Sequence, residues 1–164
     1  MTEFQTRMGT SMRLRAFALT AFAAVALLIF PAAAQTQAGN ALREWGMLGW
    51  WSLNCALPVS QNNFYYGYVT DPAGRAWHER DFGGSSPNDR SEVTAAEIKA
   101  DGTISITVNF TSINQVRTIV FAREGNRMRA MFNRGAGGDV TVENGTFKHN
   151  GRPTPWQSKC REAS

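Results

Sequence analysis

Strict alternation of apolar and polar residues over 103–110 constrains the fold of this chain more than any other feature. Large apolar side chains occupy every second position: Ile104, Ile106, Val108 and Phe110. A period of two places the two sets on opposite faces of a β-strand, so the pattern predicts a sheet with one buried face. Asp101-Gly102 is a preferred hairpin turn, and it joins this strand to a predicted partner over 92–99.

Strand-like segments separated by turn residues fill most of the chain. The predicted strands cover 50–55, 64–70, 75–82, 92–99, 103–110, 115–123, 127–134 and 139–143. Most links between them are short and rich in Gly, Asn, Asp or Pro, which favours sequential hairpins, and only 82–91 has the length of a true loop. We therefore predict an all-β fold, an antiparallel meander of about eight strands that closes into a small β-barrel. A two-layer β-sandwich is the alternative.

The N-terminal segment has the organisation of a secretory signal peptide. A basic region with three arginines precedes an uncharged, mostly apolar run over 16–30. The small residues at 32–34 then match the pattern that signal peptidase cleaves. The sequence predicts a signal peptide over 1–34, a flexible lead-in with a short helical turn over 35–47, and a single barrel domain over 48–164. Three apolar side chains of the lead-in are expected to dock on this domain: Leu42, Trp45 and Met47.

The two cysteines, Cys55 and Cys160, are expected to form a disulfide, because export would place them in an oxidising compartment. The bond would tie the C-terminal tail to the first strand, and closing a loop of roughly a hundred residues stabilises a fold by about 4–5 kcal/mol at most. The predicted location is the periplasm or the cell exterior. The whole chain has a formal net charge of +4, and removal of the signal peptide with its arginines would make the charge less positive. A weakly charged domain argues against nucleic acid as a partner. No second apolar run is long enough to span a membrane, and we expect a monomer.

Both ends of the predicted domain carry a tryptophan close to a cysteine. The first motif is Trp51-Ser52-Leu53-Asn54-Cys55, and the second is Trp156-Gln157-Ser158-Lys159-Cys160. This pair resembles a group of small secreted bacterial proteins of unassigned function, which have a W-S-x-x-C opening, a β-rich middle and a W-x-x-x-C close. The resemblance covers most of the predicted mature chain. It implies secretion, a disulfide and a β fold, and it implies no activity.

Gly49-Trp50-Trp51 matches the G-x-W motif in the first strand of lipocalins, so the domain is also similar to that family. The resemblance implies a lipocalin-like barrel in which a tryptophan closes the floor and a basic residue near the C-terminus stacks on it. Arg161 and Arg152 are the candidates for that basic residue. The sequence lacks the T-D-Y motif of the family and a clear C-terminal helix.

No pattern typical of catalysis, metal binding or a cofactor is present. The two histidines, His78 and His149, have no further ligand-type residue at metal-ligand spacing, and both are expected at the surface or the barrel rim. A nucleophile elbow, a phosphate loop and a dinucleotide fingerprint are all missing from the sequence. We therefore predict no catalytic residue, no metal and no cofactor, and favour a non-enzymatic role.

Aromatic side chains crowd the first half of the domain and supply a candidate ligand site. Tyr66 and Tyr68 share one face of a predicted strand with Phe64, and Trp77 follows on the next strand. Aromatic residues with polar tips suit a cavity for a small apolar or amphipathic ligand, and they suit an ordinary barrel core as well. The leading functional prediction is a secreted or periplasmic binding protein that holds such a ligand through Tyr66, Tyr68 and Trp77.

Arginine dominates the basic residues of the second half. Four arginines have the same sequence parity on one predicted hairpin and are expected to line one outer face: Arg117, Arg123, Arg127 and Arg129. A guanidinium donates paired hydrogen bonds to carboxylates and phosphates, so this face is a candidate surface for an envelope protein. A solvated strand face is the alternative interpretation. The second functional prediction is a protein-interaction module, such as an inhibitor or an envelope assembly factor.

Overall fold

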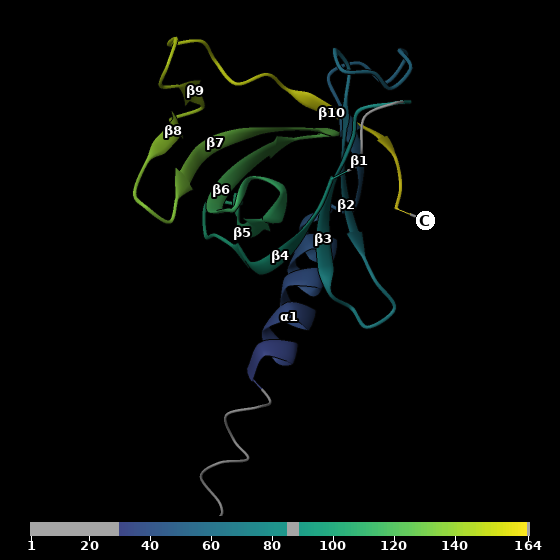
Figure 1. The fold of residues 1–164 in the computed structure, drawn as a ribbon, viewed down its shortest axis with the longest axis vertical. Helices are drawn as coiled ribbons and strands as arrows, with labels where there is room; N and C mark the ends of the chain where they lie inside the picture. The colour runs from purple at the N-terminus through teal and green to yellow at the C-terminus, as the bar shows by residue number, and fades with distance from the viewer. Residues whose placement is uncertain (1–29, 85–88, 164) are drawn as a thin grey trace, which may run out of the picture. The chain divides into compact units, whose positions relative to one another are not determined.

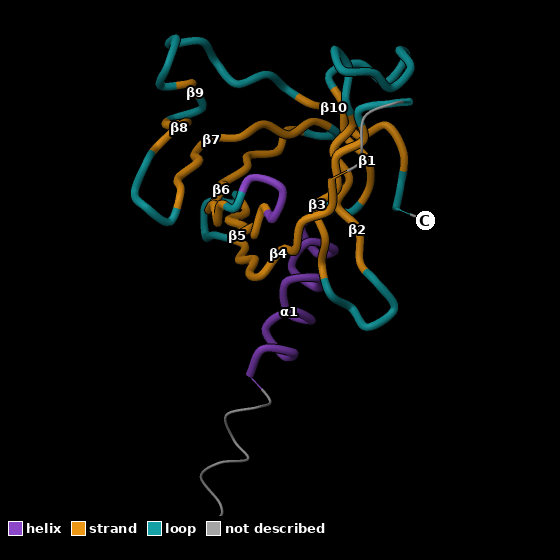
Figure 2. The backbone as a smooth tube through the Cα atoms, viewed as in Figure 1, coloured by secondary structure: helices purple, strands orange, loops and turns teal. Residues whose placement is uncertain are grey.

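The computed structural model describes residues 30–84 and 89–163, and Figures 1 and 2 show that strands dominate it. One α-helix, α1 (Phe30–Trp45), precedes the strands, and a 3-10 helix, η1 (Thr111–Ile113), links two of them. The strands are β1 (Gly49–Ser52), β2 (Tyr65–Thr70), β3 (Ala76–Asp81), β4 (Asp89–Ile98), β5 (Ile104–Phe110), β6 (Gln115–Glu124), β7 (Arg127–Gly135), β8 (Val140–Glu143), β9 (Thr146–Phe147) and β10 (Gln157–Arg161). Residues 1–29 of the predicted signal peptide and 85–88 of the predicted loop lie outside the described residues. In the part of the chain that is described, no helix has the length and apolarity to cross a membrane.

Strands β1 to β7 pair antiparallel in chain order, and β10 pairs with both β1 and β7. The second pairing closes these strands into an eight-stranded barrel. The predicted antiparallel barrel is therefore confirmed, and the β-sandwich alternative is wrong. The membership of the ring differs from the prediction, because β10 completes it, whereas β8, predicted over 139–143, forms a hairpin with β9 beyond β7 (Figure 1).

The alternation predicted for 103–110 is present in β5 and supplies much of the barrel core. Ile104, Ile106 and Val108 are fully buried, and they belong to one cluster with apolar residues of neighbouring strands: Val93, Ile119, Phe121 and Met128. The hairpin with β4 is confirmed. Its turn requires Gly102, whose φ of 82° lies in the left-handed region that glycine adopts at little cost.

Helix α1 covers one end of the barrel, and Figure 1 shows it at the end opposite the β8–β9 hairpin. Its buried residues recur at the spacing of a single helix face: Ala38, Leu42 and Trp45. The helix ends in a Schellman motif, in which Gly46 has a φ of 80° and the Met47 N–H donates to the Leu42 carbonyl at 2.8 Å. The Trp45 indole N–H donates to the Gly102 carbonyl in the β4–β5 turn at 2.8 Å, which fixes the helix to the barrel end.

The lead-in is more ordered than the sequence predicted. Docking of Leu42, Trp45 and Met47 is confirmed, since all three side chains are buried. The segment 35–40, predicted to be flexible, instead belongs to α1. The helix lies so close to the β2–β3 turn that a Cβ atom at Gly39 would come within 2.5 Å of the Gly74 carbonyl oxygen. Packing against the barrel, which the local sequence does not reveal, therefore orders this segment.

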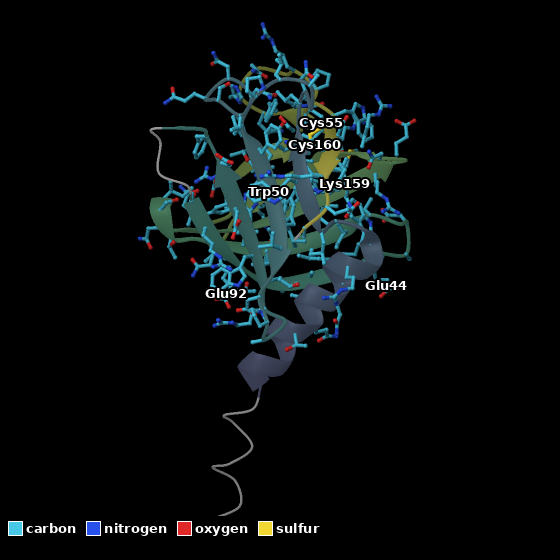
Figure 3. The ribbon with its side chains drawn as sticks, turned by 90° about the vertical axis from the view of Figure 1, so that its right-hand side faces the viewer. Glu44, Trp50, Cys55, Glu92, Lys159 and Cys160 are labelled. Atoms are coloured by element: carbon cyan, nitrogen blue, oxygen red, sulfur yellow. A yellow bond between two sulfur atoms is a disulfide. The ribbon has the colours of Figure 1, made fainter. Side chains whose placement is uncertain are left out.

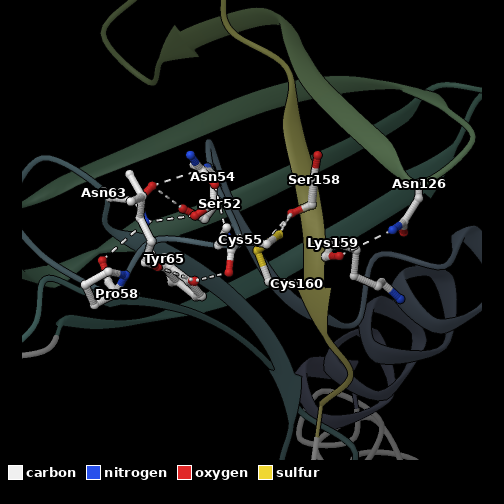
Figure 4. The surroundings of a disulfide bond; sticks show 12 residues. Ser52, Asn54, Cys55, Pro58, Asn63, Tyr65, Asn126, Ser158, Lys159 and Cys160 are labelled. Atoms are coloured by element: carbon white, nitrogen blue, oxygen red, sulfur yellow. Dashed lines mark hydrogen bonds between the residues drawn. A yellow bond between two sulfur atoms is a disulfide. The ribbon is translucent and has the colours of Figure 1, made fainter.

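The predicted disulfide is present and joins the chain after β1 to β10. Cys55 and Cys160 are bonded, with Cα atoms 5.1 Å apart, and Figure 3 shows the bond toward the end of the barrel away from α1. The loop that carries Cys55 is held by Asn63, whose Oδ1 accepts a hydrogen bond from Ser52 Oγ at 2.9 Å (Figure 4). The Asn63 amide donates to three carbonyls of the same loop, those of Asn54, Leu57 and Pro58.

A bulge in β7 changes which of its residues face the barrel interior. The pairing of β7 with β6 skips Met131, which is the extra residue. The sequence predicted a continuous apolar face made by Met128, Ala130 and Phe132. The first two face the interior, but beyond the bulge Asn133 replaces Phe132 as the inward residue. The bulge thus introduces a polar side chain into the barrel.

Candidate ligand cavity

The barrel holds a cavity of about 300 Å³, equal to the liquid volume of about ten water molecules. Six aromatic side chains line it: Phe64, Tyr66, Tyr68, Phe110, Phe121 and Phe147. Leu53 and Pro155, from the segments that follow β1 and precede β10, border the cavity at the end opposite α1. Since α1 covers one end, the cavity opens toward the other.

The two predicted tyrosines form one wall of the cavity together with His78. Cross-strand pairing sets Tyr68 opposite His78 and Tyr66 opposite Arg80. The centroid of the imidazole lies 5.0 Å from that of the Tyr68 ring and 5.5 Å from that of Tyr66, with the rings stacked, and it meets Phe110 in a T-shaped arrangement. The structure therefore brings Tyr66 and Tyr68 to a single cavity wall.

His78 is only 4% exposed, so the expectation of a surface or rim histidine is wrong. Burial lowers the pKa of its imidazole to about 4; the Gly67 carbonyl and the Asp89 charge oppose this shift, and the Arg80 charge adds to it. The ring is therefore neutral at neutral pH. Its Nδ1 has no hydrogen-bond partner among the described residues, although buried polar atoms normally have one.

Arg80 is the only formally charged side chain among the residues that line the cavity. Its Nη2 donates to the Asp89 carboxylate and to Ser112 Oγ, and the guanidinium lies over the rings of Phe82 and Phe110 at 5.5 and 5.8 Å. Burial acts to raise the pKa of Asp89, but hydrogen bonds from Arg80 and Ser112 and the Arg80 charge outweigh it and hold that pKa below its usual value. The two residues thus form a partly buried ion pair.

Burial also keeps both cavity tyrosines in the neutral form. It raises the pKa of Tyr68, with Tyr66 adding to the effect, and it raises the pKa of Tyr66 against the opposing charge of Arg80. The hydroxyl groups can therefore donate and accept hydrogen bonds without carrying charge. The cavity combines aromatic walls, neutral polar tips and a single cation.

Asn133 adds a polar group from β7, and its orientation depends on Arg117. The Arg117 Nε donates to Asn133 Oδ1 at 2.7 Å, and the same guanidinium donates to Gln115 and Thr141 and pairs with Asp139 at 3.0 Å. Arg117 is only 9% exposed. It is therefore a buried side chain that positions its neighbours, and it does not belong to an outer face.

The structure does not bring the four predicted arginines together on one face. Arg117 is buried, and Arg123 donates to the Trp45 carbonyl and lies over the Trp45 ring at 5.2 Å. Only Arg127 and Arg129 share a surface, where they lie over the ring of Trp156 at 5.2 and 4.9 Å. These contacts remove the geometric basis for an interaction surface made by all four.

Trp77, the third predicted ligand residue, does not line the cavity. It pairs with Val69, one position out of phase with the His78–Tyr68 pair, and so it lies on the outer face of β3. There its ring is covered by Arg90 at 4.4 Å and by Arg75 at 5.5 Å. Trp77 is therefore an element of the outer surface.

A cation also stacks on each of the other tryptophans. Arg161 lies over Trp50 at 4.7 Å, and the Lys159 ammonium lies over Trp51 at 5.5 Å. The lipocalin resemblance implied such stacking for Arg161 or Arg152 on the tryptophan of its motif. The motif tryptophan is Trp51, and the cation over it is Lys159 in place of either arginine, whereas Arg161 stacks on Trp50.

The sequence interpretation missed His78, Arg80 and Asn133 as cavity residues. Alternation over 77–81 places His78 and Arg80 on one strand face, but which face turns inward depends on the register across the preceding turn. No sequence signal identifies Asn133, because it faces inward only through the bulge in β7.

The candidate site consists of the cavity and the polar groups in its wall. Among residues 30–84 and 89–163, no group of three or more His, Cys, Asp or Glu side chains is placed to hold a metal ion. Comparison of the chain with protein-family models, with curated proteins and with solved structures finds no match in any of the three.

Proposed function

We propose that this protein is an exported β-barrel that binds a small amphipathic ligand in its interior without converting it. The observation that carries the proposal is a cavity of about 300 Å³ inside the barrel, walled by aromatic side chains. This volume lies at the lower limit of small-molecule sites in proteins, which are mostly apolar with a few placed polar groups.

The polar groups of the cavity support an amphipathic ligand. His78, Arg80, Asn133 and Gln157 are the strongly polar residues of a lining that is otherwise mostly aromatic and aliphatic. A purely apolar ligand would cover the polar groups that line the cavity without giving them hydrogen bonds, which is costly in a buried site. A ligand with one polar end removes that cost.

The proposal includes a location in the periplasm or outside the cell. The Cys55–Cys160 disulfide supports an oxidising compartment, and the predicted signal peptide over 1–34 provides a route to it.

Filling the cavity tests this function. Ala130→Leu adds volume at the cavity wall, whereas Ala95→Leu makes the same change at an exposed position of β4. The probe is N-phenyl-1-naphthylamine, a neutral dye whose fluorescence rises in apolar surroundings. We expect the dye to bind the wild type and Ala95→Leu equally and Ala130→Leu about tenfold more weakly, because the added side chain takes up its space.

Thermal melting checks that the filled variant folds, and Val142→Phe, which fills the same cavity from β8, is the second variant. Equal titration curves for the wild type and both filled variants would contradict the proposal. So would a wild-type protein that does not bind the dye.

A further inference from the structure

The guanidinium of Arg80 is anchored on one side only. Its Nη2 donates to Asp89 and Ser112, while its Nε is buried and has no hydrogen-bond partner among the described residues. A guanidinium carries five N–H donors in a fixed plane. Asp89 and Ser112 therefore leave donor capacity on Arg80 unused.

The anchoring residues do not share the cavity wall with Arg80. Neither Asp89 nor Ser112 is among the residues that line the cavity, and the Asp89 side chain is only 10% exposed. The same carboxylate is held by Ser112 Oγ at 2.8 Å and contacts Ser91 Oγ at 3.4 Å. The ion pair thus presents its cationic member to the cavity.

The level of Arg80 in the cavity predicts how a bound molecule is oriented. Arg80 pairs with Tyr66, one inward position nearer the open end than the pair of His78 with Tyr68. Below that level the wall is made by neutral side chains, among them Tyr68, Phe121 and Ala130. A ligand in this cavity meets apolar surface at depth and a cation near the opening.

We infer that the ligand carries a carboxylate, which accepts hydrogen bonds from Arg80 near the cavity opening while its apolar body lies against Tyr68 and Phe121. This inference rests on the proposed function and specifies the ligand class. A hydrogen bond between a carboxylate and a guanidinium is about twice as strong as a neutral one, so it gives a preference over a neutral head group of equal length.

A head-group series tests the inference. Decanoate, 1-decanol and decylammonium have the same chain and differ in the charge of the head group, and their affinities can be measured by isothermal titration calorimetry. We expect the wild type to bind decanoate about tenfold more tightly than 1-decanol and to bind decylammonium most weakly.

Two variants are expected to change the preference for decanoate in opposite directions. Asp89→Asn removes the competing anion, so we expect decanoate binding to tighten several-fold while 1-decanol binding stays the same. The double variant Arg80→Gln/Asp89→Asn removes both charges without leaving one buried alone, and it should abolish the preference for decanoate. Arg90→Gln, on the outer face beside Trp77, is the matched control and should behave as the wild type.

The outcomes separate this inference from the function on which it rests. Equal binding of decanoate and 1-decanol by all four proteins overturns the carboxylate inference and leaves a binding barrel. Binding of neither by the wild type overturns both. Thermal melting of each variant establishes that it is folded, and tightening in Asp89→Asn cannot arise from a loss of structure.

Discussion

At the scale of single residues, His78 couples the stability of the barrel to pH. Burial among Tyr66, Tyr68 and Phe110 lowers the pKa of its imidazole from about 6.5 to about 4. Between these pH values the unfolded chain binds a proton that the folded chain does not, so the free energy of unfolding falls as the pH falls. The loss begins near pH 6.5, is complete near pH 4, and amounts to about 3 kcal/mol at most.

His78→Phe removes the titrating group and keeps an aromatic ring between the two tyrosines. We expect its free energy of unfolding, measured in urea, to stay nearly constant from pH 6.5 to about pH 4.5, where the wild type loses about 2 kcal/mol or more. His149→Gln, in an exposed turn, is the matched control and should retain the wild-type decline. A His78→Phe profile as steep as that of the wild type would show that other groups cause the pH dependence.

At the scale of elements, the register between strands decides which side chains share a face, and the register was the part that the sequence did not reveal. Glu124 pairs with Arg127 across the β6–β7 turn, so odd-numbered residues of β6 face the same side as those even-numbered residues of β7 that precede the bulge. The four arginines of equal parity therefore fall on opposite sides of the hairpin. The strands themselves were predictable from alternation and turn residues, whereas the bulge at Met131 depends on how the closed barrel packs.

Helix α1 contributes to the barrel core, because its apolar face packs against one end of the barrel. The Leu42 side chain is 0% exposed, so Leu42→Ala leaves a cavity in its place. We expect this variant to lower the free energy of unfolding by about 2–5 kcal/mol. Gln37→Ala, on the exposed side of the helix, should change it by less than about 0.5 kcal/mol. The measurement is urea unfolding, and equal midpoints for the two variants would mean that the helix is not docked. Dye binding at the far end should survive in both.

At the scale of the whole molecule, three connections hold the ring of strands closed. β10 pairs with β1, β10 also pairs with β7, and the disulfide joins the chain beside the same strands. The meander of β1 to β7 follows from the succession of hairpin signals in the sequence. The closing strand was not predicted, because Gln157–Arg161 lacks apolar alternation and forms a strand only where two open edges receive it.

The disulfide should contribute strongly to stability, since it closes a loop with a sequence separation of 105 residues. We expect Cys55→Ser/Cys160→Ser to fold with a Tm lower by about 8 °C or more, because its unfolded chain gains conformational freedom. Wild type treated with a reducing agent should melt at the same temperature as the variant. An unchanged Tm, together with two free thiols in the untreated wild type, would contradict this expectation.

Closure by β10 also determines the order in which this chain can finish folding. β1 is made early, yet its second neighbour follows more than a hundred residues later, as the spacing of the disulfide shows. Contacts between distant segments form slowly, because a long loop must close before they gain any energy. Until then β1 and the first residues of β7 each keep an unpaired edge, and such an edge pairs readily with another chain. The risk of aggregation is therefore greatest in the interval before β10 pairs, when the strands still form an open sheet.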